Sequence, residues 1–182
     1  MHVSFCIIGL LSTTLAFIVP PYLPNGAYHG TLNNSGQVIF EKLSNLFHSG
    51  SPPPTKEPAH PHTIGPLHKR GDQTGCPWDG TRRIDAVTAD LALDKFKEQV
   101  NAQTAIIPPR KLLIIVQDKV FWFGCNYNRD SIYSISNYDL GVTLASIDYK
   151  CGRGIAGWDY FGGLDVTIGV EAVGYGVCEN MW

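Results

Sequence analysis

The sequence predicts an α+β fold, a split β-α-β-β-α-β sandwich in which a four-stranded antiparallel sheet carries two helices on one face and is stapled by disulfides. Three observations predict it. Residues 111–116 and 120–125 are two apolar runs separated by three polar residues, the pattern of a hairpin at the centre of a sheet. Within residues 71–182, helical spacing of apolar side chains occurs once before this hairpin and once after it. Four cysteines spread over the same region indicate a small exported domain with two disulfides.

The first strand and helix are predicted from residues 83–100. Polar and apolar side chains alternate over residues 83–87, which predicts a strand. Thr88 is placed to cap the helix that follows, and its apolar stripe continues to Val100. Pro108 and the proline after it prevent any continuation of the helix.

The second half of the fold begins at Ser136, which forms a predicted capping box with Asp139. The helix that it opens is expected to end at Cys151 facing the core, with Gly152 as terminator. A loop rich in glycine and aromatic residues covers residues 154–163. A last strand is predicted at residues 164–170, and the chain closes through its final cysteine.

The amino-terminal residues 1–16 have the pattern of a secretory signal peptide. A short apolar run ends in Thr-Leu-Ala, which predicts cleavage after Ala16. The run lacks a preceding lysine or arginine, and the alternative is a membrane anchor. Because it is near the lower limit for a span and no basic stop signal follows, we expect secretion to the extracellular space without membrane insertion.

A dibasic pair, Lys69 and Arg70, divides the rest of the chain into two chemically different parts. All six histidines and nine of the twelve prolines precede it, and all four tryptophans follow it. The pair lies between a proline and a glycine, which is typical of an exposed processing site. We therefore expect a pro-segment over residues 17–70 and a mature domain over residues 71–182.

The pro-segment is expected to be disordered or extended, because its composition is rich in proline and polar residues. One island, residues 38–47, has apolar side chains at helical spacing and is expected to form a transient turn. Asn33 begins the one glycosylation sequon. The scattered histidines predict no metal site and no cofactor. The simplest role of the segment is to keep the domain inactive or to help it fold.

The cysteines of the domain are Cys76, Cys125, Cys151 and Cys178, and they allow three disulfide pairings. Zinc is the competing interpretation, but the gaps are long and no Cys-x-x-Cys pair exists. An ideal split unit places Cys76 and Cys125 at the same end of the sheet and Cys151 at the other. This argument favours Cys76–Cys125 with Cys151–Cys178.

Charge and residue content restrict the function classes. Residues 71–182 hold ten Lys and Arg against fourteen Asp and Glu, a net charge of −4, with no basic run longer than two residues. Nucleic acid is therefore not expected as a partner. The domain contains no histidine, which removes the usual general base, and its cysteines are expected to be oxidised. The sequence does not indicate an oligomeric state.

Carboxylates are the remaining catalytic groups, and a pair of them can hydrolyse a glycosidic bond. The candidates are Asp159, Asp165 and Glu171, which lie near the aromatic loop. The alternative is that these are ordinary loop and strand-exit charges. We favour the alternative and expect that the protein is not an enzyme.

Residue types that carry interface energy are better represented. Trp158, Tyr160 and Phe161 lie between glycines, and Arg153 is close to them in the sequence. They form the candidate binding patch, whose partner is expected to be a host protein or glycan. The alternative is that the rings cover the open side of the sheet as part of the core.

Short motifs surround the cysteines of residues 120–178: Phe-Gly-Cys-Asn-Tyr ending at Tyr127, Lys-Cys-Gly ending at Gly152, Gly-Trp ending at Trp158, and Gly-Tyr-Gly-Val-Cys ending at Cys178. Together with the predicted signal, the pro-segment that ends in Lys-Arg and the four-cysteine body, they resemble small secreted fungal effectors that a kexin-type protease processes. Killer-toxin-like proteins share the α/β sandwich layout. The resemblance implies an effector that binds a host target; the alternative is a killer-toxin-like or antimicrobial protein, and a carboxylate-based hydrolase is third.

Overall fold

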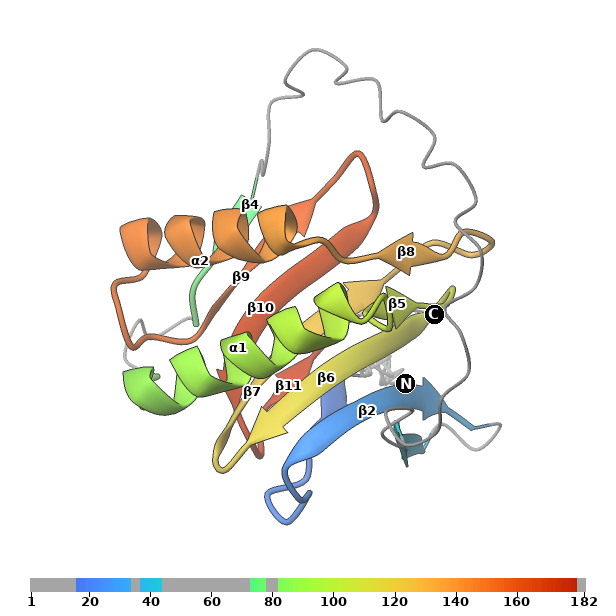
Figure 1. Cartoon of the computed structure of the whole chain (residues 1–182), viewed down its shortest axis with the longest axis horizontal. Helices are drawn as coiled ribbons and strands as arrows, with labels where there is room; N and C mark the ends of the chain where they lie inside the picture. The colour runs from blue at the N-terminus through green and yellow to red at the C-terminus, as the bar shows by residue number, and fades with distance from the viewer. Residues whose placement is uncertain (1–15, 34–36, 44–72, 78–81, 180–182) are drawn as a thin grey trace, which may run out of the picture.

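The computed structural model describes residues 16–33, 37–43, 73–77 and 82–179, and in these residues it has an α+β fold. Seven strands form one antiparallel sheet in the order β3-β2-β6-β7-β10-β9-β4. In chain order they are β2 Gly26–Leu32, β3 Val38–Lys42, β4 Gln73–Gly75, β6 Lys111–Gln117, β7 Val120–Asn126, β9 Gly157–Phe161 and β10 Val166–Ala172. Helices α1 (Ala86–Asn101) and α2 (Asn137–Lys150) lie on one face of this sheet (Figure 1). The predicted class is confirmed, but the sheet has seven strands instead of four.

The helix-covered face holds the larger part of the core. Helix α1 packs on β6 and β7, and α2 packs on β9 and β10. Trp122 is the largest side chain between α1 and the sheet, and its indole nitrogen donates a hydrogen bond of 2.9 Å to the carbonyl of Ala89. A buried indole N–H needs such a partner. Phe96 and Leu140, one from each helix, are fully buried in the same layer.

The hairpin and the second helix are confirmed as predicted. Strands β6 and β7 pair along their full length, from Lys111 opposite Asn126 to Gln117 opposite Val120. The hydroxyl of Ser136 accepts from the backbone of Asp139, whose carboxylate accepts from the Ser136 backbone in return. The helix ends where Gly152 has a φ of 97°, a conformation that favours glycine.

The predicted strand over residues 83–87 is wrong. Arg83 forms only an isolated bridge with Ile155, and α1 already begins at Ala86. Its cap is Asp85 instead of Thr88, because the Asp85 carboxylate accepts from the Thr88 backbone at 2.7 Å. Ile84 is buried before the helix begins, whereas Val87 on the first turn of α1 is 68 % exposed, so the alternation does not continue as a strand.

The expectation of a disordered segment over residues 17–70 is wrong for the part that the structure describes. Residues 17–43 contribute β2 and β3 to the main sheet and also β1 (Phe17–Ile18). Phe17 and Tyr28 are 1 % and 3 % exposed. The island at residues 38–47 begins with a strand, because its side chains alternate beside β2. The proline-rich composition of residues 17–70 as a whole indicated disorder, although no proline lies within β2 or β3.

The face opposite the helices is covered by a two-stranded ribbon. Strand β1 pairs with β11 (Gly176–Val177), so that the two ends of the described chain lie together. Phe17 and Val177 pack there against Phe121 and Phe123 of β7. Because one apolar cluster lies under the helices and another under this ribbon, the central strands of the sheet carry apolar side chains on both faces.

A separate two-stranded pair joins β5 (Ile106–Ile107) to β8 (Tyr133–Ser134).

Two disulfides are present, but the predicted pairing is wrong. Cys76 is bonded to Cys151, with 5.6 Å between their Cα atoms, and Cys125 to Cys178, with 5.7 Å. Cys76 follows β4, which pairs with β9 at the edge of the sheet beside the end of α2. The Cys125 side chain points to the opposite face, where the end of the chain folds across the sheet. The prediction failed because it placed Cys76 before a strand that does not form.

Other expectations about the amino-terminal half are tested only in part. Residues 1–15 of the predicted signal peptide and the Lys69-Arg70 pair lie outside the described residues, and cleavage at both sites stays a prediction. Asn33 lies at the end of β2, where its side chain accepts from the backbone of Gln37 at 2.9 Å. No helix in the described part of the chain is long and apolar enough to cross a membrane.

We expect the stability of the fold to depend on pH through His29 in β2. Burial lowers the pKa of His29, and Lys111 on β6 lowers it too, whereas a hydrogen bond to the Ile106 carbonyl on β5 and the charge of Glu41 on β3 raise it. Because the folded pKa is below the ordinary value, the stability that neutral His29 contributes is present above pH 6.5 and is lost as pH falls through the folded pKa. Between pH 7 and pH 5 the melting temperature should therefore fall further in the natural protein than in His29→Gln. Equal falls in a paired calorimetric titration would contradict this.

Candidate functional site

The four residues of the predicted binding patch do not stay together. Residues 157–161 form strand β9 instead of a loop, so that successive side chains point to opposite faces of the sheet. Phe161 is 6 % exposed and packs in the core under the helices. Trp158 and Tyr160 lie on the other face and are half-buried. Arg153 belongs to neither group, because it follows the end of α2.

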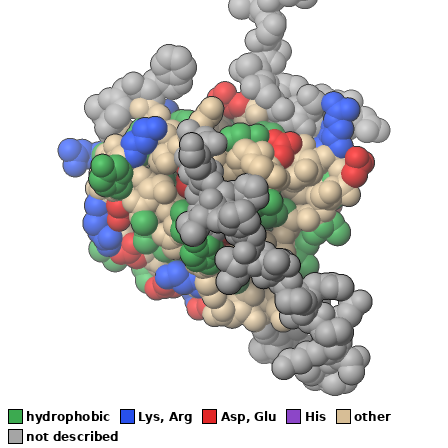
Figure 2. Space-filling view, turned by 90° about the horizontal axis from the view of Figure 1, so that it is seen from above, with side chains coloured by type: hydrophobic (Ala, Val, Ile, Leu, Met, Phe, Trp, Pro, Cys, Tyr) green, Lys and Arg blue, Asp and Glu red, His purple; other side chains and the backbone are tan. Residues whose placement is uncertain are grey.

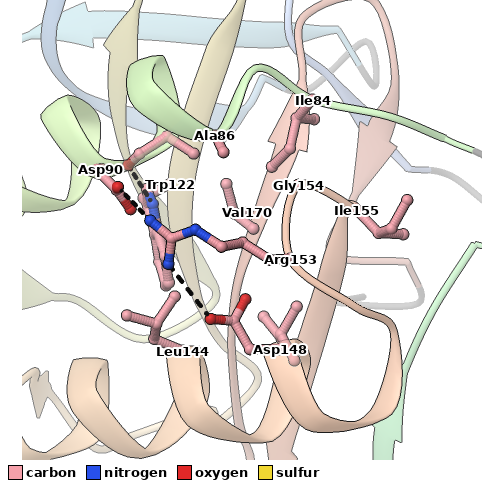
Figure 3. A pocket seen from close by; sticks show the side chains of 12 residues that line it. Ile84, Ala86, Asp90, Trp122, Leu144, Asp148, Arg153, Gly154, Ile155 and Val170 are labelled. Atoms are coloured by element: carbon pink, nitrogen blue, oxygen red, sulfur yellow. Dashed lines mark hydrogen bonds and ion pairs between the residues drawn. The ribbon is translucent and has the colours of Figure 1, made fainter.

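Arg153 joins the two helices across their crevice (Figure 3). One guanidinium nitrogen donates to the Asp90 carboxylate of α1 at 2.6 Å, and another lies 3.7 Å from a carboxylate oxygen of Asp148 of α2. Beneath it is a cavity of about 20 Å³ with Trp122 and Val170 among its lining residues. Such a space holds about one water molecule, so it is too small for a ligand. Because these charges are largely exposed, we assign Arg153 a modest structural role.

Trp158 is held in place by glycines on both neighbouring strands. Its cross-strand partners are Gly75 on β4 and Gly169 on β10. A Cβ atom at Gly75 would lie 2.2 Å from the indole ring, and one at Gly169 would lie 2.8 Å from the Trp158 Cβ. The indole therefore lies flat against the sheet, partly within the core and partly at the surface. Part of the ring therefore contributes to the core, as one alternative expected, and a binding role for the exposed part stays a prediction.

Tyr160 and Tyr127 continue the same surface. The Tyr160 hydroxyl donates to the Asp165 carboxylate at 2.9 Å. The two tyrosine rings meet edge to face, with 6.3 Å between centroids and 83° between planes. This geometry suits the quadrupoles of aromatic rings. We name Tyr127, Trp158 and Tyr160 the aromatic surface.

The tyrosines of the aromatic surface remain uncharged at neutral pH. The hydrogen bond to Asp165, and then burial, raise the pKa of Tyr160. Burial raises the pKa of Tyr127, and a hydrogen bond with Thr167 opposes this rise only in part. The surface therefore offers neutral rings and two hydroxyl groups beside a carboxylate. This set of groups suits recognition through stacking and hydrogen bonds.

The three candidate catalytic carboxylates are not brought together. Asp159 is buried on the helix-covered face, where its carboxylate accepts from Thr74. Glu171 is buried on the opposite face and forms an ion pair of 2.7 Å with Arg82. Asp165 lies in the turn before β10, with a φ of 51°. Two carboxylates on opposite faces of one sheet cannot flank a single glycosidic bond.

Arg82 builds a polar cluster at the far end of β10 that the sequence did not indicate. Its guanidinium lies over the ring of Tyr175, 3.8 Å from the centroid, while it pairs with Glu171. A nearly buried carboxylate requires such a partner, and the stacked ring shields the pair from water. The cluster holds the turn that leads from β10 to β11. We therefore regard it as structural.

In the described part of the chain, groups of metal-ligating side chains are absent, and the charged side chains on one face are dispersed. Among the described residues, no group of three or more His, Cys, Asp or Glu side chains is placed to hold a metal ion. On the face shown in Figure 2, the Lys and Arg side chains gather at separate edges, with acidic side chains scattered near them. The charges on this face are therefore mixed in sign.

Sequence reasoning found two members of the aromatic surface and missed the third. Tyr127 follows the apolar run of β7, and it reaches Tyr160 only because β10 lies between β7 and β9 in the sheet. No signal within residues 120–127 indicates this neighbour.

Comparisons with protein-family models, with curated proteins and with solved structures found no match to this chain.

Proposed function

We propose that this protein is a secreted effector that is matured after Lys69-Arg70 and acts by binding a host protein or glycan through the aromatic surface. The observation that carries the proposal is the placement of Tyr127, Trp158 and Tyr160 on one face of the sheet, partly exposed and beside Asp165. Aromatic side chains of this kind carry a large share of interface energy.

Three further observations support the proposal. Both disulfides suit an oxidising compartment outside the cytosol. The candidate carboxylates lie apart, which weakens the hydrolase hypothesis. The resemblance of residues 120–178 to secreted fungal effectors, and to the sandwich of killer-toxin-like proteins, concerns the same part of the chain that carries the aromatic surface. A split β-α-β-β-α-β arrangement, with a first strand other than residues 83–87, belongs to this proposal as well.

A paired bioassay tests the proposal. The purified, oxidised protein is infiltrated into plant tissue, where cell death or a changed defence response is measured, and it is added to growing fungi, where growth is measured. An effect on plant tissue alone supports the effector. Growth inhibition of fungi alone supports the killer-toxin-like alternative.

The aromatic surface predicts which variants lose the effect on the host. Tyr160→Ala removes a ring and the hydroxyl that donates to Asp165. We expect it to weaken target binding by about 2 kcal/mol or more, roughly thirtyfold, because central aromatic residues dominate interfaces. Binding to host extract components or to a glycan array measures this loss.

The matched control is Tyr149→Ala, which removes a tyrosine that is 94 % exposed on α2, away from the aromatic surface. It should bind like the natural protein. Circular dichroism on both variants verifies that each remains folded. A folded Tyr160→Ala protein with unchanged binding and unchanged host response would remove the aromatic surface from the proposal.

A further inference from the structure

The described residues between Phe17 and Leu43, here called the N-terminal strap, lie along the open side of strand β6. Strand β2 pairs with β6 from Gly26 opposite Val116 to Gly30 opposite Leu112. Without β2, strand β6 would be the edge of the sheet and would present its backbone groups to solvent. The strap therefore occupies a site of the kind to which an extended peptide adds as a strand.

Side chains of the strap fill the apolar face beside this edge. Phe17, Val19 and Tyr28 are 1 %, 0 % and 3 % exposed, and they belong to one cluster with Ile114 and Phe121. The Tyr28 hydroxyl donates to the Pro24 carbonyl at 2.8 Å, so that the ring is held within the strap itself. The strap therefore contributes buried side chains to the core in addition to its backbone hydrogen bonds with β6.

Polar contacts fix the register of the strap on β6. The Asn25 side chain accepts from the backbone of Asp118 at 2.6 Å and donates to the Asp118 carboxylate at 3.1 Å. Asp118 lies in the turn of the β6–β7 hairpin and has a φ of 52°. At Gly30 an added Cβ would lie 2.6 Å from the Leu112 side chain, so this side chain occupies the space above the glycine. These contacts together favour one register of β2 on β6.

No disulfide holds the strap to the rest of the protein. Both disulfides lie within residues 76–178, and the one cysteine before them, Cys6, precedes the predicted signal cleavage. The chain between the strap and the body runs from β3 to β4, which are the two outermost strands of the sheet. A cut between these strands breaks no strand pair and leaves every described contact of the strap available.

We propose that the strap is a subunit and not a discarded pro-segment: after the cut at Lys69-Arg70, it stays bound along β6, and the mature protein consists of two non-covalent chains. The cut itself rests on the proposed function. The site on β6 is then a strand-addition site whose occupant is the N-terminal chain. Before the cut the strap is covalently linked to the body; after the cut it is a separate chain that binds β6 with a dissociation constant.

The experiment starts from the oxidised full chain, which is cut with a kexin-type protease and examined by native mass spectrometry and gel filtration. The expected result is one particle that contains both fragments, which separates into two chains under denaturing conditions without reductant. Its melting temperature should rise with protein concentration after the cut and be independent of concentration before it. A folded 71–182 fragment that runs alone at micromolar concentration overturns the proposal.

Two variants test whether the strap is held by the contacts described. Tyr28→Ala removes a buried ring and should raise the dissociation constant of the cut particle about a hundredfold or more. Tyr22→Ala is the control, because this ring lies in the same strap and is 82 % exposed. It should leave the dissociation constant within about twofold. Equal constants for the two variants would also overturn the proposal.

A second chain separates failure of this inference from failure of the proposed maturation. In it, the site of a sequence-specific viral protease replaces Lys69-Arg70. If the kexin-type protease leaves the natural chain uncut, the maturation proposal fails, and the viral protease then supplies the cut. Retention or loss of the N-terminal chain in that sample supports or overturns the inference by itself.

Discussion

A chain that begins at Gly71 is expected to lose most of its stability when it is produced alone. The deletion removes β1, β2 and β3 and with them the buried side chains of Phe17, Val19 and Tyr28. Each contributes roughly 2 kcal/mol by burial, against a total of roughly 5–15 kcal/mol for a domain of this size. The fragment also exposes the edge of β6 and an apolar face, which favours aggregation.

Calorimetry and binding of a hydrophobic dye, compared between chains that begin at Gly71 and at Phe17, check this expectation. The shorter chain should lack a sharp unfolding transition and should bind the dye. Addition of a separately produced peptide of residues 17–43 should restore part of the transition. A cooperative transition at the same temperature in both chains would show that the strap is dispensable.

Removal of either disulfide is expected to cost about 4 kcal/mol. The bonds close sequence separations of 75 and 53 residues, and the chain-entropy model assigns similar stabilisation to both. For a protein of this length, the loss corresponds to a fall of about 8–16 °C in melting temperature. The double variants Cys76→Ala/Cys151→Ala and Cys125→Ala/Cys178→Ala, measured by calorimetry, test it.

The two double variants differ in where the structure loosens, and each is the control of the other. Cys178 ties the β1–β11 ribbon to β7, so loss of Cys125–Cys178 should speed amide hydrogen exchange in residues 17–19 and 173–178. Loss of Cys76–Cys151 should instead speed amide hydrogen exchange in β4 and at the end of α2. Identical exchange patterns in the two variants would contradict the pairing, as would a non-reducing peptide map that joins Cys76 to Cys125.

The elements that the sequence predicted correctly are those with local causes. The β6–β7 hairpin follows from two apolar runs and a short polar connection. The start of α2 follows from a capping box, and its end follows from Gly152, whose φ is 97°. Each of these signals lies within a few residues of the feature that it decides, and therefore a single sequence contains enough information.

The predictions that were wrong concern features decided by segments that are distant in the sequence. Strands β2 and β3 lie in a segment whose overall composition is rich in proline, and they are part of the sheet because β2 pairs with the edge of β6. The disulfide pairing depends on which face of the sheet each cysteine meets. For Cys125 that face is the one covered by the C-terminal ribbon, which no local pattern of residues indicates.

The candidate site on strand β9 also combines features that the sequence determined with features that only the tertiary structure decided. The sequence singled out Trp158 and Tyr160 as candidates for a binding patch or for the core, and its composition excluded histidine chemistry from residues 71–182. The alternation of β9 then separated Phe161 from them, and the order of strands added Tyr127. Residue types are a property of the chain, whereas neighbours across a sheet depend on strand order and register, which arise only when distant segments pair.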